Sequence, residues 1–363
     1  MSPPPAHSKK LMRDSDILRL RLNNQRLSVS KFEQPTEVVR WLGAVQAQDY
    51  HAAKWALALR SANTTELKIE EAFSKGQILR THVMRPTWHF VTPEDIGWLL
   101  ELTSPRVNAL CAHYYRKLEL DDRFFRRAHK VISKALQREK YLTRAELRDR
   151  LIAQRIEPGD SVRMGFILIR AELDGLVCSG PRRGKQFTYA LLHERAPSLK
   201  RITRDEALAN LTLRYFKSHG PATIHDFAWW SGLALSDVRA GVEMVARKLQ
   251  SEQGYYFSGT ASDAIPEVIL LPAFDEYLVG YTDRSAATEQ SPAQDQLPNA
   301  IFNSVVLIRG LVKGDWNKKS NAKELVVNVN NWAEMSKKVA RALESAAVNY
   351  GQFMGLPSRI NLL

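Results

Sequence analysis

The sequence predicts an α+β protein that is mainly helical, with repeated units of helices and a hairpin, then a small β-rich portion and a terminal helix. The first observation is a series of helix-start signals, in which a Thr and an acid three residues later satisfy each other's backbone donors. The second is that pairs of short β-rich runs, joined by turns, follow helical segments. The third is a change of character near residue 263, after which β-rich runs dominate. A chain of 363 residues is also too long for one ordinary core.

Residues 14–120 form the first predicted unit, after a tail over residues 1–13 whose proline and lysine content predicts disorder. Apolar spacing predicts helices near residues 14–24, 36–46, 50–60 and 66–75. They lead into ILRTHVMRPTWHFV, where two β-rich runs flank Arg85-Pro86. A capping box at Thr92–Asp95, with Pro93 at the first helical position, predicts the start of a further helix.

Residues 121–200 form the second predicted unit. A capping box at Thr143–Glu146 precedes two segments with helical apolar spacing, and LVCSGPRRGKQFTYALL follows as two β-rich runs around a Gly/Pro/Arg turn. Helices followed by a hairpin with a basic tip are the pattern of a winged helix. Because similar patterns occur on both sides, we expect three winged-helix units in tandem.

Residues 201–262 form the third predicted unit, with capping boxes at Thr203–Glu206 and Thr223–Asp226. WSGLALS indicates a helix-turn-helix corner, and YYFSG indicates the remnant of a hairpin. In residues 263–363, EVILLPAFDEYLVGY, SVVLIRGLVKGDW and ELVVNV predict a small sheet or barrel. DRSAATEQSPAQDQLPN predicts a flexible loop, and AEMSKKVARALESAAVNYGQFMG predicts the terminal helix.

The charge of the chain points to nucleic acid as a partner. Lys and Arg outnumber Asp and Glu by 52 to 39, which gives a net charge of +13 and a sequence pI near 9.7. Phosphate neutralisation favours binding at such an excess, although a charge spread evenly for solubility would give the same total. No apolar run approaches the roughly 20 residues of a membrane span, and the N-terminus lacks an apolar signal segment. Cys111 and Cys178 show no metal-ligand or disulfide spacing, so we expect a cytoplasmic, nucleoid-associated protein without membrane contact.

The tripeptide Gln46-Ala47-Gln48 interrupts what would otherwise be one long helix. Asp49 is a good N-cap for YHAAKWALALR, which would end the preceding helix before Gln48. An extended backbone there would set both amides side by side, facing one cleft. The alternative is that the two glutamines only cap helix ends at a domain junction.

Three segments carry a resemblance to a known family: VQAQDYHAAKWALALR, LRTHVMRPTWHFVTPED and LLPAFDEYLVGYTDRS. Together they resemble the bacterial winged-helix family that contains the AlkZ DNA glycosylase, from about residue 14 to about residue 350. That family excises alkylated bases, and its founding member unhooks interstrand crosslinks. Its signature is Gln-x-Gln, whereas a related branch carries Gln-x-Asp. The resemblance implies that Gln46 and Gln48 are the catalytic residues of a monofunctional DNA glycosylase that needs no cofactor and no metal.

The chemistry of two amides suits a cationic substrate. Glutamine cannot act as a general base near neutral pH, but it can hold a water molecule and turn its carbonyl dipole toward developing positive charge. An N7- or N3-alkylated purine is already cationic and departs without a proton. The catalyst then needs chiefly to position water and stabilise an oxocarbenium-like transition state.

Further residues are candidates for contact with double-stranded DNA. His82, Arg85 and His89 could lie near the glutamines, although a wing strand with hydrogen-bonded histidines is the alternative. The basic wing tip contributes three candidate phosphate contacts, which could also be merely solvated: Arg182, Arg183 and Lys185. The family probes the DNA minor groove with a hairpin in its C-terminal part, which implies a role for Lys313 in LIRGLVKGDW.

Two acids and two tryptophans are expected to be structural: Asp275, Glu276, Trp229 and Trp230. Two other functions stay open, a winged-helix transcription regulator that reads a major groove and an inactive accessory protein of DNA repair. A regulator would need a dimerisation surface, and no heptad segment supports one, so we expect a monomer.

Overall fold

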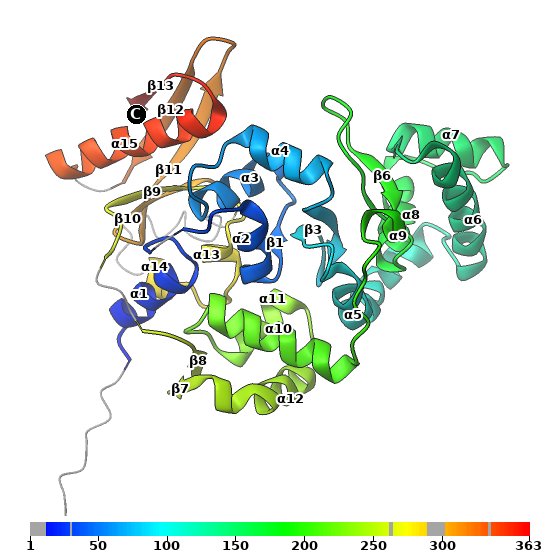
Figure 1. The fold of residues 1–363 in the computed structure, drawn as a ribbon, viewed down its shortest axis with the longest axis horizontal. Helices are drawn as coiled ribbons and strands as arrows, with labels where there is room; N and C mark the ends of the chain where they lie inside the picture. The colour runs from blue at the N-terminus through cyan, green and yellow to red at the C-terminus, as the bar shows by residue number, and fades with distance from the viewer. Residues whose placement is uncertain (1–11, 30, 261–263, 289–301, 333–334) are drawn as a thin grey trace, which may run out of the picture.

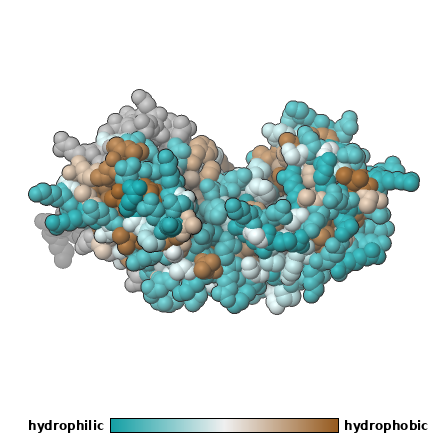
Figure 2. Space-filling model, turned by 90° about the horizontal axis from the view of Figure 1, so that it is seen from above, coloured by the Kyte–Doolittle hydropathy of each residue, from teal (hydrophilic) through white to brown (hydrophobic). Residues whose placement is uncertain are grey.

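The structure, a computed structural model, describes residues 12–29, 31–260, 264–288, 302–332 and 335–363. The second predicted unit lies at one end and the C-terminal sheet at the other, with the first unit between them and the third below (Figure 1). Seen from above, the surface is hollowed between two mostly hydrophilic lobes (Figure 2). Residues 1–11 of the predicted tail and most of the loop predicted over residues 283–299 lie outside the described residues.

The first unit opens with a helix and continues as a winged helix. Its helices are α1 (Asp14–Asn24), α2 (Pro35–Leu42), α3 (Tyr50–Leu59) and α4 (Glu66–Ser74), and its strands are β1 (Val45–Gln46), β2 (Leu79–Val83) and β3 (Arg85–Val91). The strands form one antiparallel sheet in the order β1-β3-β2. Helix α2 stops at Leu42 rather than near residue 46, because Gly43 adopts a φ of +86° and the next residues join the sheet.

Helix α5 (Ile96–Lys117) connects the first unit to the second and begins later than the sequence predicted. The Thr92 hydroxyl donates to the Asp95 carboxylate at 2.8 Å, and Trp98 Nε1 donates to the same group at 3.0 Å. Asp95 is the residue before the helix, and Pro93 lies in the turn that precedes it.

The second and third units repeat the order of elements seen in the first. The second contains α6 (Asp122–Glu139), β4 (Leu142–Thr143), α7 (Arg144–Ala153), α8 (Ser161–Leu173), β5 (Val177–Ser179), β6 (Thr188–Leu191) and α9 (Leu192–Arg195). The third contains α10 (Arg204–Ser218), α11 (Ile224–Ser231), α12 (Leu235–Val245), the 3-10 turn η1 (Ala246–Lys248), β7 (Gln250–Glu252) and β8 (Tyr255–Phe257). The second unit's sheet has the order β4-β6-β5, and a single bridge between Ala222 and Tyr256 replaces the first strand of the third. The three predicted capping boxes in these units all form.

The C-terminal portion is a five-stranded sheet with one long helix. Its elements are β9 (Val268–Leu271), α13 (Glu276–Val279), α14 (Ser285–Thr288), β10 (Val305–Ile308), β11 (Leu311–Ser320), β12 (Leu325–Asn331), α15 (Lys337–Met354) and β13 (Ser358–Leu362). The order is β13-β12-β11-β10-β9, and β13 is a parallel edge strand that the sequence did not predict. The predicted fold class, α+β and mainly helical, is confirmed. Within the described ranges, no helix is both long and apolar enough to cross a bilayer.

The second unit has a separate hydrophobic core, whereas the other units share theirs. The second unit has its own core, which includes Leu136 and Ile167, whereas Leu57 of the first unit and Val327 of the C-terminal sheet share one cluster. Leu79 of the first unit and Phe227 of the third share another. The first and third units and the C-terminal sheet therefore pack as one body around the first unit's sheet.

Candidate active site

Gln46 lies on the extended strand β1 between α2 and α3, and Gln48 lies at the bend that leads into α3. In the β1–β3 pairing, Gln46 stands opposite His89, and the next amide, Ala47 N, donates to Trp88 O at 2.7 Å. The Asp49 side chain accepts from two amides at the start of α3, each at 3.0 Å, so the predicted N-cap is confirmed.

Each glutamine amide is oriented by a donor from β3. Gln46 is only 7% exposed, and its Oε1 accepts from Arg85 Nη2 at 3.3 Å. Gln48 is exposed, and its Oε1 accepts from Trp88 N at 3.4 Å. A carbonyl oxygen has two lone pairs. Each glutamine therefore keeps one acceptor position, and no described residue accepts from either side-chain nitrogen.

Glu276 anchors the peptide of Gln46 from the far end of the sequence. This fully buried carboxylate accepts from Gln46 N at 2.7 Å, from Trp230 Nε1 at 2.8 Å and from His219 Nε2 at 3.4 Å. Burial opposes its charge, but the hydrogen bonds and the charge of Arg85 outweigh burial and lower the pKa of Glu276 to about 2. Glu276 is therefore a carboxylate at neutral pH and cannot donate a proton.

The neighbouring acid, Asp275, fixes the position of Glu276. Two Arg60 nitrogens donate to its two oxygens at 2.7 and 2.8 Å, and both side chains are buried. Arg60 follows the last residue of α3, so the helix that begins at Asp49 is held at its other end by the strand–helix segment that carries Glu276. Asp275 plays the structural role that the sequence suggested.

Arg85 connects the glutamines to the third unit. Its Cζ lies 5.8 Å from the centroid of the Trp229 ring, which is 44% exposed, although the sequence suggested that this tryptophan is in the core. Trp229 Nε1 donates to Val279 O at 3.2 Å. Gly232, with a φ of +70°, follows α11, and a Cβ there would clash with the Met84 carbonyl oxygen in the β2–β3 turn. The glycine therefore lets α11 approach the turn that presents Arg85.

The two histidines near the motif are interior groups, which corrects their predicted role as DNA contacts. His89 is 0% exposed and hydrogen-bonds Thr87 O through Nδ1 at 2.9 Å. Burial, aided by the charge of Arg85, lowers the pKa of His89 to about 3. His82, 3% exposed, hydrogen-bonds Glu172 of α8 through both its backbone amide and Nδ1. Neither ring offers a surface to DNA, so both position β2 and β3.

The basic wing tip lies between α4 and α7. Arg182 is mostly covered and pairs with Glu70 at 3.2 Å, and Arg183 is 55% exposed and pairs with Glu146 at 2.6 Å. Lys185 is exposed and faces a cleft described below. Arg182 therefore anchors the wing to the first unit, whereas Arg183 and Lys185 remain accessible.

Lys313 lies at the base of the hairpin that projects from the C-terminal sheet. The β10–β11 turn, at Arg309-Gly310, packs against α1 rather than projecting, because Gly310 approaches the side chains of Leu18 and Leu22. The projecting hairpin is β11–β12 (Figure 1), whose tip spans residues 321–324. The hairpin predicted in LIRGLVKGDW therefore forms, as β10–β11, but the hairpin that projects is the next one along the chain.

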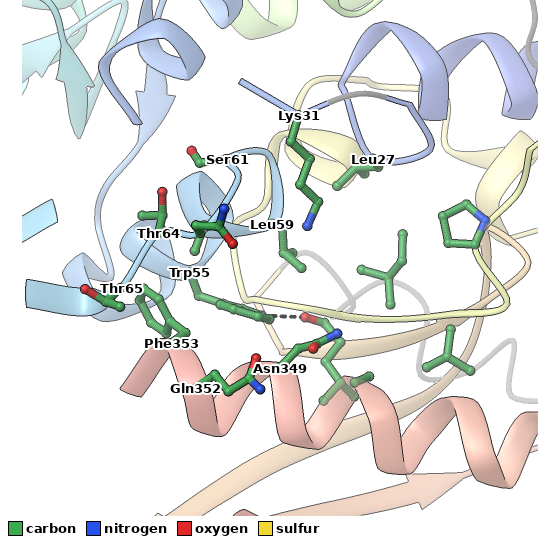
Figure 3. A pocket seen from close by; sticks show the side chains of 17 residues that line it. Leu27, Lys31, Trp55, Leu59, Ser61, Thr64, Thr65, Asn349, Gln352 and Phe353 are labelled. Atoms are coloured by element: carbon green, nitrogen blue, oxygen red, sulfur yellow. Dashed lines mark hydrogen bonds between the residues drawn. The ribbon is translucent and has the colours of Figure 1, made fainter. Parts of the chain in front are cut away.

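Two clefts border the motif and differ in charge. One, of about 640 Å³, runs between the start of α3 and β11 and includes the carboxylates of Asp49 and Asp315 and one cation, Lys318. The other, of about 600 Å³, lies between Trp88 and the second unit and is lined by several arginines. A third cleft, of about 620 Å³, is lined by Lys31, Trp55 and residues of α15 (Figure 3). Neither glutamine lines any of the three clefts. Asp49, next to Gln48, lines the first cleft, and Trp88, whose amide donates to Gln48, lines the second, so these two lie beside the motif.

Sequence reasoning missed the roles of Glu276, Arg80 and Trp229. The hydrogen bond from Gln46 to Glu276 joins positions 230 residues apart, and nothing in the local pattern signals it. Arg80, whose Nε donates to Ala47 O at 3.0 Å, stood out only as one cation of a basic stretch. The side chains in the described ranges include no group of three or more His, Cys, Asp or Glu that could hold a metal ion.

Comparisons with known proteins agree on one family. The interstrand DNA cross-link repair glycosylase of Streptomyces sahachiroi is 26% identical over 370 residues, which covers 95% of this chain and 98% of that protein. The solved structure of the Streptomyces sahachiroi DNA glycosylase AlkZ superposes with a TM-score of 0.78 at 23% identity, covering 97% of this chain and all of that one. The sequence model described as DNA glycosylase AlkZ-like matches residues 39–353, which include both glutamines, and the chain therefore belongs to the AlkZ-like DNA glycosylase family.

Proposed function

We propose that this protein hydrolyses the N-glycosidic bond of cationic alkylated purines in duplex DNA, with Gln46 and Gln48 as the catalytic residues. The observation that carries the proposal is the pair of amides two residues apart, each oriented by a donor from β3 and each with an acceptor position and an amino group left over. Such a pair can hold a water molecule and face positive charge without transferring a proton.

The reaction that fits this pair needs no acid. The bond between C1′ and the purine nitrogen breaks, and its electron pair neutralises the charge of the alkylated base. Water then bonds to C1′ and releases a proton, which leaves an abasic site and the free base. The groups nearest the motif agree, because Glu276 is ionised and His89 is neutral near pH 7.

The preferred lesions are part of the same proposal. N7-alkylguanine and N3-alkyladenine carry the required charge, and so does a purine N7 joined to the opposite strand in an interstrand crosslink. The cross-link repair activity in the name of the Streptomyces sahachiroi relative supports including crosslinks. The carboxylates of Asp49 and Asp315 would attract a cationic base on the α3 side of the motif.

The proposed partner is the DNA duplex, bound by a monomer in the cytoplasm at the nucleoid. Arg85 reaches the lesion strand beside Gln46, and Arg183, Lys185 and Lys313 contact the backbone. Arg182, committed to Glu70, acts through the wing that it anchors.

A transcription regulator is the weaker alternative. In such proteins the second helix of the helix-turn-helix enters the major groove. Here the corresponding helix of the second unit, α8, packs against α5 and β2, and its Glu172 is bonded to His82. The side of α8 that carries Glu172 is therefore unavailable for reading bases.

The deciding experiment incubates the protein, in the presence of EDTA, with duplex DNA that contains N7-methylguanine. Chromatography then detects the released base. We expect free N7-methylguanine from the parent protein and a large loss for the Gln46→Ala/Gln48→Ala double variant. If the folded parent protein releases no base from any alkylated duplex, the glycosylase function is rejected and the role of an inactive accessory protein is favoured.

A further inference from the structure

We propose that the cleft between β3 and the second unit binds the sugar–phosphate backbone of the lesion-bearing strand, and that Arg80 links this binding to the catalytic tripeptide. The inference rests on the proposed function and adds to it the place where the strand is held. The residues that form the cleft come chiefly from β2, β3, α7, α8 and the wing, and they include Arg80, Trp88, Arg144, Arg148, Lys185 and Phe187.

The cations that line this cleft form no ion pair with a carboxylate in the described part of the chain. Four of its residues are cations, Arg80, Arg144, Arg148 and Lys185, and none of its residues is acidic. Arg144 and Arg148 donate to the carbonyl oxygens of Ser161 and Gly159, which are neutral. Over the described ranges, no carboxylate lies within ion-pair distance of any of the four, whereas Arg182 and Arg183 close by are both paired. Four cations without acids in one cleft favour a polyanion.

The shape and apolar walls favour a nucleotide chain over a lone anion. A volume of about 600 Å³ far exceeds that of one phosphate, and Trp88, Met164 and Tyr189 supply apolar surface between the cations. Deoxyribose presents apolar faces between successive phosphates. The Arg80 guanidinium covers one face of Trp88 and one face of Phe187, with Cζ at 4.2 and 4.6 Å from the ring centroids. The His82 ring contacts Trp88 at a centroid distance of 4.3 Å, and Arg182 Cζ lies 5.0 Å from the Phe187 centroid. Stacking of a base on these rings is therefore blocked, which leaves the backbone as the fitting ligand.

Arg80 gives the cleft a direct connection to the chemistry. Its Nε donates to Ala47 O, the carbonyl between the two glutamines, at 3.0 Å, while its Nη groups have no hydrogen-bond partner among the described residues. Burial lowers the pKa of Arg80 to about 10, so it stays charged at neutral pH. The adjacent Trp88 amide donates to Gln48. A phosphate on the Nη groups would thus fix the strand in register with both amides, which makes Arg80 a positioning residue.

Two variants test the cleft and its link. Arg144→Gln/Arg148→Gln should weaken binding to a duplex that carries an uncleavable abasic analogue by about tenfold or more, and lower the log–log salt slope by about two. Arg150→Gln/Arg204→Gln is the matched control, because it also removes two cations, each in an exposed ion pair with Glu139 or Asp237. Arg80→Lys keeps the charge but not the geometry, so it should lower the single-turnover excision rate at saturating enzyme more than it lowers affinity.

The outcomes separate this inference from the proposed function. If the parent protein excises no alkylated base, the proposed function fails whatever the cleft binds. If the parent protein excises, and the Arg144/Arg148 variant binds like the parent or loses no more affinity than the control, the cleft is not the backbone site. If Arg80→Lys, with folding checked by its unfolding curve, reduces affinity and not the saturated rate, the positioning role of Arg80 is wrong.

Discussion

Replacing Glu276 by Gln should both destabilise the fold and slow base excision. The carboxylate accepts hydrogen bonds from Gln46 N, Trp230 Nε1 and His219 Nε2 with its two oxygens. The amide of Gln keeps the shape but turns one acceptor into a donor that faces a donor. An unsatisfied buried donor costs about 1–3 kcal/mol.

The size of the expected loss of stability also follows from the charge of Glu276. The pKa of Glu276 falls from an ordinary value of 4.5 to about 2 in the folded protein. A depression of this size corresponds to stabilisation of the ionised form by about 3 kcal/mol. Because the folded pKa is the lower one, this stabilisation is fully present above about pH 4.5 and is lost as the pH falls toward 2.

Urea unfolding of the parent protein and of Glu276→Gln at pH 7 and near pH 4 measures this directly. We expect the variant to lose about 3 kcal/mol at pH 7, with a smaller difference at the lower pH. Glu324→Gln, which breaks an exposed ion pair with Arg359, is the control and should change stability by less than about 1 kcal/mol. Excision by the folded variant should fall by about tenfold to a hundredfold, because Gln46 loses its anchor. Equal unfolding free energies for the parent and Glu276→Gln at pH 7 would refute this account of Glu276.

Four further predictions follow from the site. Gln46→Ala and Gln48→Ala should each lower the single-turnover excision rate by about a hundredfold or more with DNA affinity nearly intact, and parent-like rates in folded variants would remove the glutamines from the mechanism. Arg183→Gln/Lys185→Gln should weaken binding to unrelated duplexes and lower the salt slope by up to about two; an unchanged salt slope for this variant would mean that the wing faces away from DNA. Arg182→Gln should chiefly lower the stability of the fold, because it leaves Glu70 without this ion pair. N7-alkylguanine and N3-alkyladenine should be excised while uracil, hypoxanthine and undamaged guanine resist, and efficient release of the neutral bases in the same assay would contradict a mechanism without an acid. Because the folded pKa of His89, about 3, lies below its ordinary 6.5, His89 stays neutral and the excision rate should stay flat from about pH 6 to about pH 9. The neutral ring of His89 should contribute stability that is lost only as the pH falls below about 6.5. A steep loss of excision rate toward alkaline pH would point to a protonated group instead.

Local patterns predicted the elements that local forces determine. The capping boxes at Thr143, Thr203 and Thr223 depend on contacts within one helical turn, and all of them form. The N-cap at Asp49 is equally local. The strand at Gln46, in contrast, depends on its pairing with β3 and on Glu276, and the assignment of the catalytic pair drew on the family resemblance.

The sequence could not reveal what depends on distant partners. Whether His89 is a surface contact or a buried neutral ring is decided by packing of β3 between two other elements. Arg182 and Lys185 look alike in PRRGK, but only the first meets an acid, Glu70, that lies 112 positions earlier. Strand β13 escaped prediction because SRINL is short and half polar, and its pairing with β12 stabilises it.

The bond between Gln46 and Glu276 has a consequence for how the protein is made. A ribosome releases both glutamines long before it releases the carboxylate that holds them, since 230 positions separate the two. During that interval the first unit lacks both this carboxylate and the part of its hydrophobic core that the C-terminal sheet supplies. Activity is thereby coupled to completion of the polypeptide, and a product cut short before the C-terminal sheet would lack an assembled reaction centre.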